Sequence, residues 1–314
     1  MKTLLQNDKL MKYKSIIALI LFSVIVTIIN PSFLSFSNIL NVLRQTSINA
    51  IIAAGMTFVI LTGGIDLSVG SILGLAGAVA ASLITRGQNV FVVLIAALLI
   101  GAAIGALNGV VISKGKVQAF IATLAMMTLV RGYILVFTDG KPIGIEASKN
   151  ADILASIGSG YILGIPIPIY ITALVFIIAY YILKHTRFGR YVYAMGGNEE
   201  ATKLSGINVA RVKIFVYALS GALAALAGII VTARLSSAQP QAGSGYELDA
   251  IAAVVLGGTS LSGGTGNIFG TIVGALIIGI LNNALNLMDV SSYYQLLAKG
   301  LVILIAVLLD RKNK

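Results

Sequence analysis

The chain contains no cysteine, and its 314 residues include a single histidine, His185. Without cysteine, a disulfide, a thiolate metal site and a cysteine nucleophile are all excluded, and one histidine excludes a metal site built from several histidines. Charged residues make up only 11% of the chain, against about 25% in an average soluble domain. Because the hydrophobic share is 58% and the mean hydropathy is +0.97, the sequence predicts a polytopic membrane protein.

Sequence motifs for nucleotide hydrolysis and for acyl transfer are also missing. The only Gly-Lys pairs, Gly115-Lys116 and Gly140-Lys141, are not followed by the Ser or Thr with which a phosphate-binding loop holds Mg²⁺. No G-x-S-x-G sequence, the mark of a nucleophile in many hydrolases, is present either. We therefore expect no enzyme activity, no catalytic residue, no metal site and no cofactor bound by this chain itself.

The chain carries 22 Lys and Arg against 11 Asp and Glu, which gives a net charge of +11. In membrane proteins such an excess collects in cytoplasmic loops and sets the topology, so we expect no nucleic-acid partner. With the N-terminus inside, 15 of the 22 basic residues fall on one side: four in the N-terminal tail, two in 113–117, six in 184–213 and three in 311–314. This asymmetry predicts an even number of spans, both termini in the cytoplasm and the 138–164 loop outside.

A membrane-spanning helix needs about 20 mainly apolar residues. Ten segments approach this length, and no hydrophilic stretch is long enough for a separate soluble domain. We therefore expect an all-α integral membrane protein of about ten transmembrane helices, a single domain over residues 1–314 with an uncleaved first span. The predicted spans are 15–34, 47–62, 67–84, 90–112, 118–137, 165–183, 213–235, 249–262, 266–288 and 293–310.

The most informative polar segment is 184–213, which lies between two long apolar spans on the predicted cytoplasmic side. Within it, Asn198 is a suitable N-cap for a short helix, because its side-chain oxygen can accept a free N–H of the first turn. Glu199 and Glu200 follow where the helix dipole favours negative charge, and Gly206 can end the helix. A helix of about two turns is marginal alone in water, so we expect it to dock against a soluble partner.

Two segments, 59–68 and 254–262, resemble each other. Both read as an apolar run, a glycine pair, two further residues and Leu-Ser, and both are predicted to run from outside to inside, which indicates a parallel repeat. Such paired, glycine-interrupted segments point to the central pathway of a transporter, although glycines serve close helix packing equally well. Our hypothesis is that the glycine pairs and the polar residues near them line a translocation path. These residues are Gln45, Asn49, Gly63, Gly64, Asp66, Ser68, Gly257, Gly258 and Ser260.

Four ionisable residues lie in or beside the apolar spans: Asp66, Arg131, Asp249 and Lys299. Charge at that depth is costly, so each of them is by default a functional hypothesis. Asp66 and Asp249 precede predicted helices, and both also fit a capping role there. For Arg131 and Lys299, pairing with an acid or a carbonyl is favoured over contact with a substrate.

Several of these segments together resemble the membrane-spanning permeases of ATP-binding-cassette importers for monosaccharides. The resemblance extends from about residue 15 to the C-terminus. It is carried by Ile-Asp-Leu-Ser-Val-Gly-Ser at 65–71, Val-Gln-Ala-Phe-Ile-Ala-Thr-Leu at 117–124, Thr-Arg-Phe-Gly-Arg at 186–190, Gly-Gly-Asn-Glu at 196–199 and Ala-Ile-Ala-Ala-Val-Val-Leu-Gly-Gly-Thr-Ser at 250–260. The resemblance implies a multi-pass protein of the bacterial inner membrane that moves a monosaccharide, with ribose favoured, and works as a homodimer.

The resemblance also implies partners. Besides membrane lipid, these are an extracytoplasmic sugar-binding protein, received by connections 35–46, 138–164 and 236–248, and a cytoplasmic ATPase of two fused cassettes. That ATPase, not this chain, would use ATP and Mg²⁺. Segment 198–206 would be the coupling helix, in which both glutamates contact the ATPase and Leu204 is the apolar anchor; its residues are Asn198, Glu199, Glu200, Ala201, Thr202, Leu204 and Gly206.

An ATPase-independent channel or an ion-coupled secondary sugar carrier is the alternative function. Either would account for the apolar spans and the glycine repeat, but not for a large cytoplasmic segment with a capped, acidic helix. A coupled carrier would also need a buried carboxylate, for which Asp66 is the candidate. A membrane scaffold without transport activity is a third class. None of these residues specifies which monosaccharide is carried.

Overall fold

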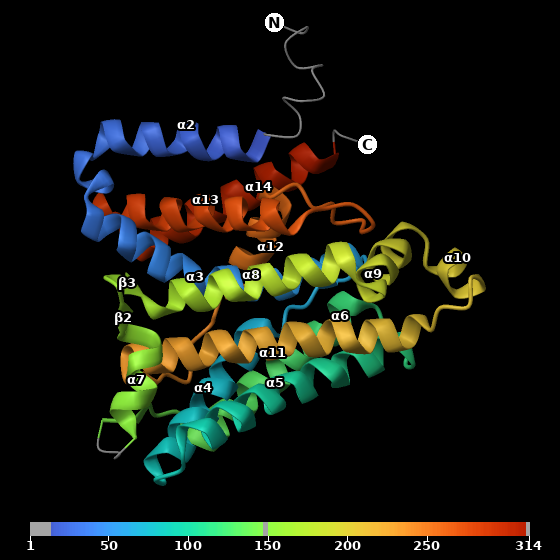
Figure 1. Cartoon of the computed structure of the whole chain (residues 1–314), viewed down its shortest axis with the longest axis horizontal. Helices are drawn as coiled ribbons and strands as arrows, with labels where there is room; N and C mark the ends of the chain where they lie inside the picture. Colours follow the sequence, from blue (N-terminus) through green and yellow to red (C-terminus); the bar gives the residue numbers. More distant parts are fainter. Residues whose placement is uncertain (1–13, 147–149, 312–314) are drawn as a thin grey trace, which may run out of the picture.

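The computed structural model describes residues 14–146 and 150–311, which form thirteen α-helices, one 3₁₀-helix and four two-residue strands (Figure 1). Most of the basic residues of the predicted N-terminal and C-terminal tails lie outside this described part. The helices are α2 (Lys14–Ile29), η2 (Pro31–Leu34), α3 (Phe36–Leu61), α4 (Val69–Thr85), α5 (Val90–Ser113), α6 (Ala119–Thr138), α7 (Ala151–Ser159), α8 (Ile167–His185), α9 (Arg187–Gly197), α10 (Glu199–Leu204), α11 (Val209–Leu235), α12 (Tyr246–Leu256), α13 (Ile268–Leu287) and α14 (Ser292–Arg311).

The strands form two small antiparallel pairs. In one, β1 (Ile143–Gly144) lies beside β4 (Ser237–Ala238), and in the other, β2 (Tyr161–Ile162) lies beside β3 (Ile165–Pro166). Both pairs lie outside the helical bundle, so the prediction of an all-α architecture holds for the bundle itself.

The helices run back and forth between two ends of the molecule (Figure 1). One end, which we call the α10 end, holds segments 114–118, 186–208 and 257–267. The opposite end, which we call the α7 end, holds segments 86–89 and 138–166. The described chain begins at the α10 end, where the Ser15 hydroxyl donates to the Leu256 carbonyl over 2.8 Å. Its last helix, α14, returns to the same side in Figure 1.

Each of the ten predicted spans coincides with a helix of the structure. Within the described residues, six helices are long and apolar enough to cross a membrane, namely α3, α5, α6, α8, α11 and α13. Shorter apolar helices cover Ser15–Ile29 and Val69–Thr85. The described part of the chain therefore has the architecture of an all-α membrane protein, with six helices that could cross a membrane.

The predicted connection at 35–46 is wrong, because α3 begins at Phe36 and continues unbroken to Leu61. Ser35 caps the helix by accepting the Asn38 N–H, and the chain turns before that, in η2. Some of the polar side chains that suggested a loop pair with other helices of the bundle. The amides of Asn38 and Asn283 on α13, for example, donate to each other over 3.0 and 2.9 Å.

Helix α11 lies at the centre of the bundle and packs most extensively against α5, and it also contacts α3, α4 and α7. On α5, Gly101, Gly105 and Gly109 recur every four residues and face the α11 backbone at Gly221, Tyr217 and Ile214. Small residues at this spacing let two membrane helices approach closely, where packing rather than water expulsion drives association. The resulting core is continuous and includes buried residues of α3, α4, α11 and α12.

Helix α12 is only half as long as its neighbours. It has 11 residues, and about 1.5 Å per residue gives it a length of about 16 Å. It ends at the α10 end together with α3, but it begins beside Asn49, the fourteenth of the 26 residues of α3. Its N-terminus therefore lies about 20 Å from either end of the bundle, near the middle.

Candidate functional site

The short helix α10 stands at the tip of the α10 end and has the predicted cap. Asn198 Oδ1 accepts the Ala201 N–H over 2.9 Å, and Glu199 and Glu200 form the first turn. Gly206 has a φ of +83°, a value that glycine adopts without a steric penalty, and it directly follows the helix end. The sequence thus specifies both ends of this helix locally.

The two faces of α10 differ in what they contact. Leu204 is 88% exposed and Glu200 and Ala201 are exposed, whereas Thr202 is buried and its hydroxyl donates to the Asn198 carbonyl. Thr202 therefore lies on the inner face of α10, so within the predicted coupling helix the exposed surface comes from its neighbours. The exposed face presents an apolar side chain, Leu204, beside an acidic one.

Glu199 is tied to the bundle. Its carboxylate forms an ion pair with Lys213 in the first turns of α11, with an N–O distance of 2.7 Å. Sequence analysis assigned Glu199 to the ATPase contact, but this carboxylate already has a partner within the chain. Lys213 was missed, although it lies inside segment 184–213, because an ion pair between residues 14 apart across a turn leaves no local sequence pattern.

Helix α9 connects α10 to the membrane bundle, and sequence analysis did not predict it. Thr186 caps it by accepting the Gly189 N–H, and a Thr before a helical stretch is the signal that could have revealed it. The Tyr193 hydroxyl donates to the Gly266 carbonyl over 3.1 Å. Burial raises the pKa of the Tyr193 hydroxyl above its ordinary value, so the group remains a protonated donor.

The backbone of α9 also touches the end of α3. A methyl group placed on Gly196 would overlap the Leu61 carbonyl oxygen and the Gly264 nitrogen, so only glycine fits there. The Gly264 N–H in turn donates to the Leu61 carbonyl over 2.9 Å. One contact point therefore joins α9, the end of α3 and the turn that follows α12.

The two glycine pairs end α3 and α12 in the same way, with a register that differs from the sequence alignment. Gly63 N–H donates to Ile60 O and Gly64 N–H to Val59 O; Gly258 N–H donates to Val255 O and Thr259 N–H to Val254 O. Each helix thus closes with the pattern known as a Schellman motif, with the positive-φ glycine at Gly63 and Gly258. Gly63 therefore corresponds to Gly258, not to Gly257, and the eighth predicted span ends at Leu256 rather than at 262.

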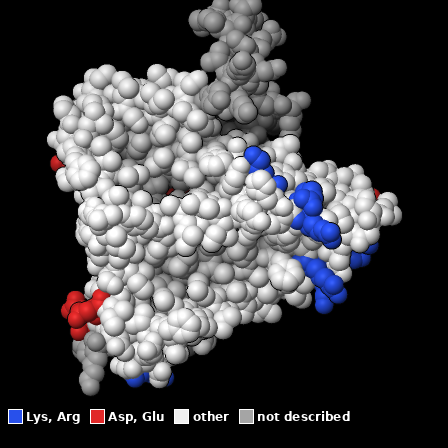
Figure 2. Space-filling view, viewed as in Figure 1, with Lys and Arg blue, Asp and Glu red and all other residues white. Residues whose placement is uncertain are grey.

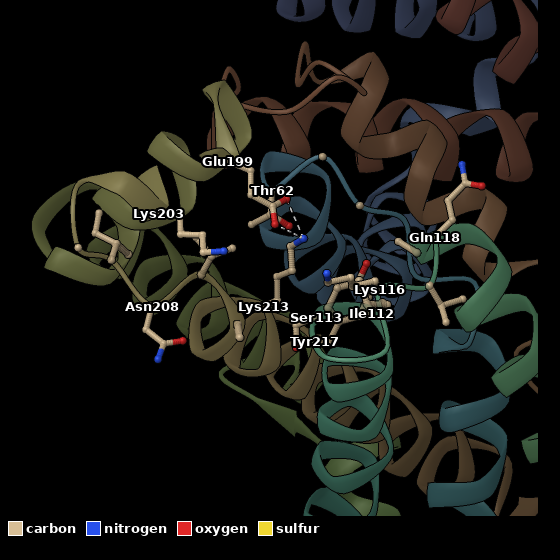
Figure 3. Close-up of a pocket in the computed structure, with 18 residues that line it drawn as sticks. Thr62, Ile112, Ser113, Lys116, Gln118, Glu199, Lys203, Asn208, Lys213 and Tyr217 are labelled. Carbon is tan, nitrogen blue, oxygen red and sulfur yellow. Dashed lines mark hydrogen bonds and ion pairs between the residues drawn. The ribbon is translucent and has the colours of Figure 1, made fainter. Parts of the chain in front are cut away.

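A cavity of about 840 Å³ lies at the α10 end, between α10 with the start of α11 and the α5–α6 turn. Figure 3 shows Lys203 and Asn208 on one side and Lys116 and Gln118 on the other, with Lys213 reaching toward Glu199 between them. Gly63 and Gly64 also line it. Because this cavity separates α10 from the α5–α6 turn, α10 is supported from one side only.

Asp66 is fully buried behind this cavity and lines neither of the two cavities described here. One carboxylate oxygen accepts from the backbone and hydroxyl of Ser68, at 3.0 and 2.6 Å, and the other accepts from the Ser220 hydroxyl on α11. Asn108 on α5 donates to the Ser68 hydroxyl. The cluster fixes the turn before α4, but the capping role predicted for Asp66 is wrong, because the N-cap is Ser68 and no side chain caps the first turn of α4.

A second cavity, of about 290 Å³, lies at mid-depth near the start of α12. Lys299 on α14 forms an ion pair of 2.9 Å with Asp249, and Asn49 donates to the same carboxylate oxygen. The cavity is lined by Gln45, Thr46, Ile48, Asn49, Arg234, Tyr246, Asp249, Ala275, Gly279, Asn282, Asn286, Gln295 and Lys299.

The residues that the sequence assigned to a translocation path therefore lie in different places in the structure. Gln45 and Asn49 line the mid-depth cavity, and Gly63 and Gly64 line the cavity at the α10 end. Gly257, Gly258 and Ser260 line neither. The pairing predicted for Lys299 is confirmed, and so is that of Arg131, which donates to two backbone carbonyls, Pro240 O at 2.7 Å and Ala242 O at 2.9 Å.

Charge is distributed unevenly between the two ends. Figure 2 shows most of the visible Lys and Arg side chains at the α10 end and an acidic group beside α7. The basic residues of segment 184–213 belong to this cluster: Lys184, Arg187, Arg190, Lys203, Arg211 and Lys213. Basic residues accumulate on the cytoplasmic side of membrane proteins, so this distribution favours a cytoplasmic α10 end.

Comparison with known proteins agrees with the helical membrane architecture. Residues 38–307 match the family model described as the permease component of the branched-chain amino acid transport system. The chain belongs to this permease family. It is an integral membrane protein and a transport subunit, not an enzyme.

Relatives within the family have been named as sugar permeases. The permease is 64% identical to a ribose import permease of Haemophilus influenzae, over 96% of this chain and 93% of the relative. It is 57% identical to a ribose import permease of Bacillus subtilis, over 95% of this chain and 92% of the relative. A D-allose transport permease of Escherichia coli is 39% identical, over 96% and 91%. No solved structure shows a significant match.

Proposed function

We propose that this permease forms the membrane-spanning part of an ATP-binding-cassette importer that carries ribose into the cytoplasm. Relatives with the same printed role are 57–64% identical across nearly the whole chain, whereas the permeases for allose, xylose and arabinose are 38–40% identical. The gap between the two groups is the reason to choose ribose over the other monosaccharides.

The observation that carries the coupling role is the geometry of α10. It is a capped helix of six residues that projects from the basic end, with Leu204 fully available on its outer face. Leu204 offers an apolar anchor to a groove in a cytoplasmic ATPase of two cassettes. Glu200 and Ala201 complete the contact face, while Asn198 and Gly206 define the ends of the helix.

Movement of α10 reaches the bundle through α9. When nucleotide binding draws the two cassettes together, α10 moves with them into the space of the 840 Å³ cavity. Helix α9 passes the displacement to its contact with Leu61 and Gly264. Since that contact joins the end of α3 to the turn after α12, both helices shift and access to the mid-depth cavity alternates between the two sides.

The same proposal fixes orientation and assembly. The α10 end faces the cytoplasm, both chain termini lie on that side, and ten helices cross or enter the bacterial inner membrane. Two copies of the chain pair, and the α7 end, with segments 138–164 and 236–245, receives a sugar-loaded binding protein. The exposed apolar side chains of α2, α5 and α6 provide surface for lipid and for the second copy.

Reconstitution tests the proposal directly. Proteoliposomes with the permease, its ATPase and a ribose-binding protein should accumulate ribose only when all three proteins and ATP with Mg²⁺ are present. Uptake that continues without the ATPase and collapses with the membrane potential would instead identify an ion-coupled carrier, and uptake that only equilibrates would identify a channel.

A further inference from the structure

The cavity of about 290 Å³ beside Asn49 extends from the middle of the bundle toward the α7 end and is lined mainly by polar side chains. It forms where the half-helix α12 begins, after a segment whose Gly243 and Gly245 have positive φ. In transporters, substrate sites lie near the bilayer midplane at the ends of such discontinuous helices. This position is a first reason to regard the cavity as part of the transport route.

A second and independent reason is a set of polar atoms without partners. Thr46 is only 5% exposed, and its hydroxyl oxygen is buried without a hydrogen-bond partner. The amide oxygens of Asn49 and Asn282 are likewise buried and unpartnered, and all three residues line the cavity. A buried polar atom without a partner costs about 1–3 kcal/mol, so three of them in residues that line one cavity favour a polar occupant there.

The remaining groups determine the kind of molecule. The negative charge of Asp249 is balanced by Lys299 at 2.9 Å, and Asn49 donates to the same oxygen, while Arg234 adds one further positive charge to the lining. The unpartnered atoms are uncharged oxygens that accept hydrogen bonds, which hydroxyl groups donate. The volume lies at the lower end of the range of small-molecule pockets, about 300–1,000 Å³, which suits a single sugar ring.

We propose that this cavity is a weak binding site for a neutral monosaccharide halfway across the membrane. Thr46, Asn49 and Asn282 accept hydrogen bonds from its hydroxyl groups, and Lys299 and Arg234 supply donors. The inference rests on the proposed function for the identity of the sugar. It goes further in placing a defined transit site within one copy of the chain, rather than leaving all selectivity to the binding protein.

Cysteine protection tests the site without any need for ATP. The chain lacks cysteine, and Gln45 is exposed at the mouth of the cavity, so Gln45→Cys provides a single reactive thiol. In nanodiscs holding the full-length permease, D-ribose at millimolar concentrations should slow maleimide labelling of this thiol. It should not slow labelling of Leu163→Cys, which is 95% exposed at the α7 end. Protection by ribose 5-phosphate but not by ribose would overturn the inference in favour of an anionic ligand.

A matched pair of substitutions separates binding from folding. Thr46→Val, made in the Gln45→Cys chain, removes the unpartnered hydroxyl and should raise the ribose concentration for half-protection about fivefold, the factor of one hydrogen bond. Thr259→Val makes the same chemical change at another fully buried, unpartnered hydroxyl that does not line the cavity, and should leave it unchanged. Equal effects of the two substitutions, or no protection of the parent chain, would overturn the inference.

The two proposals fail in different ways. If the wild-type permease shows ATP-dependent ribose uptake but Gln45→Cys is not protected, the transit site is wrong and the transport function stands. If uptake needs no ATPase but ribose protects the thiol, the transit site stands and the coupling to ATP is wrong.

Discussion

The Nζ atom of Lys213 on α11 lies 2.7 Å from each of the two carboxylate oxygens of Glu199 on α10. This pair is the direct electrostatic link between the helix at the tip of the molecule and the central helix of the bundle. Glu199 is half-exposed, so the pair is worth about 0.2–1 kcal/mol, as is usual for exposed ion pairs. Its role is to orient α10 rather than to stabilise the fold.

Removing this link should loosen the coupling helix. We expect Lys213→Ala to lower the ATP hydrolysis stimulated by the sugar-loaded binding protein by about two- to fivefold, in keeping with the energy of such a pair. The charge swap Lys213→Glu with Glu199→Lys should restore most of it. Lys116→Ala, which removes another lysine from the same cavity, is the control and should have little effect. A charge swap no better than Lys213→Ala would show that the pair does not orient α10.

Leu204 should be needed for assembly with the ATPase but not for folding. Because its side chain is 88% exposed, Leu204→Glu removes no contact within the permease, and thermal unfolding should not change. Copurification of the ATPase with the permease from detergent should be lost. Leu163→Glu makes the same change at a side chain that is 95% exposed at the opposite end, and should not affect copurification. Normal ATPase assembly with Leu204→Glu would exclude this side chain as the anchor.

The contact of Gly196 with Leu61 should be required for transmission. Gly196→Ala forces the α9 backbone away from the end of α3, and overpacking of this kind costs about 1–3 kcal/mol. We expect the ATPase to assemble and hydrolyse ATP while ribose uptake falls. The neighbouring Gly197 has open space around it, so Gly197→Ala should transport normally. Equal uptake by the two variants would place transmission elsewhere.

The Asp249–Lys299 pair should behave as a buried ion pair. Lys299→Met leaves the carboxylate of Asp249 without its counter-ion, a change that costs about 3 kcal/mol at buried sites; Lys299 itself is 24% exposed, so this is an upper figure. Thermal unfolding followed by circular dichroism should therefore occur at a lower temperature. Adding Asp249→Asn should recover most of the loss, because no charge then remains unpaired. A double variant that unfolds as early as Lys299→Met would show that the ion pair is not what stabilises this region.

Features encoded by neighbouring residues could be predicted from the sequence. The cap of Asn198 on α10 and the helix ends at Gly206 and Gly63 depend on local backbone chemistry, and the structure has them. The ten apolar segments are visible for the same reason, since length and hydropathy are local properties. For Arg131 and Lys299 the sequence predicts that each has an acid or a carbonyl as partner, because an unpaired charge at that depth is costly. It does not predict which residue the partner is.

Features that depend on contacts across the fold could not be predicted. The first turns of α3 look like a loop in the sequence because their asparagines are polar, and only the structure shows that Asn38 pairs with Asn283 on α13. In the sequence Thr202 resembles its exposed neighbours, and only the packing of α10 on the bundle shows that it is buried. The mid-depth cavity is lined by residues of α3, α11, α12, α13 and α14, so no single stretch of sequence predicts it.

Disulfide crosslinking at α10 is the most direct test of the central claim, that this helix couples the permease to an ATPase. Glu200 is exposed on α10 and the chain has no cysteine of its own, so Glu200→Cys gives one defined thiol. It would be expressed with an ATPase carrying single cysteines around its groove. We expect a specific disulfide whose yield changes with nucleotide. No disulfide at any groove position, together with ribose uptake in the absence of the ATPase, would contradict the account.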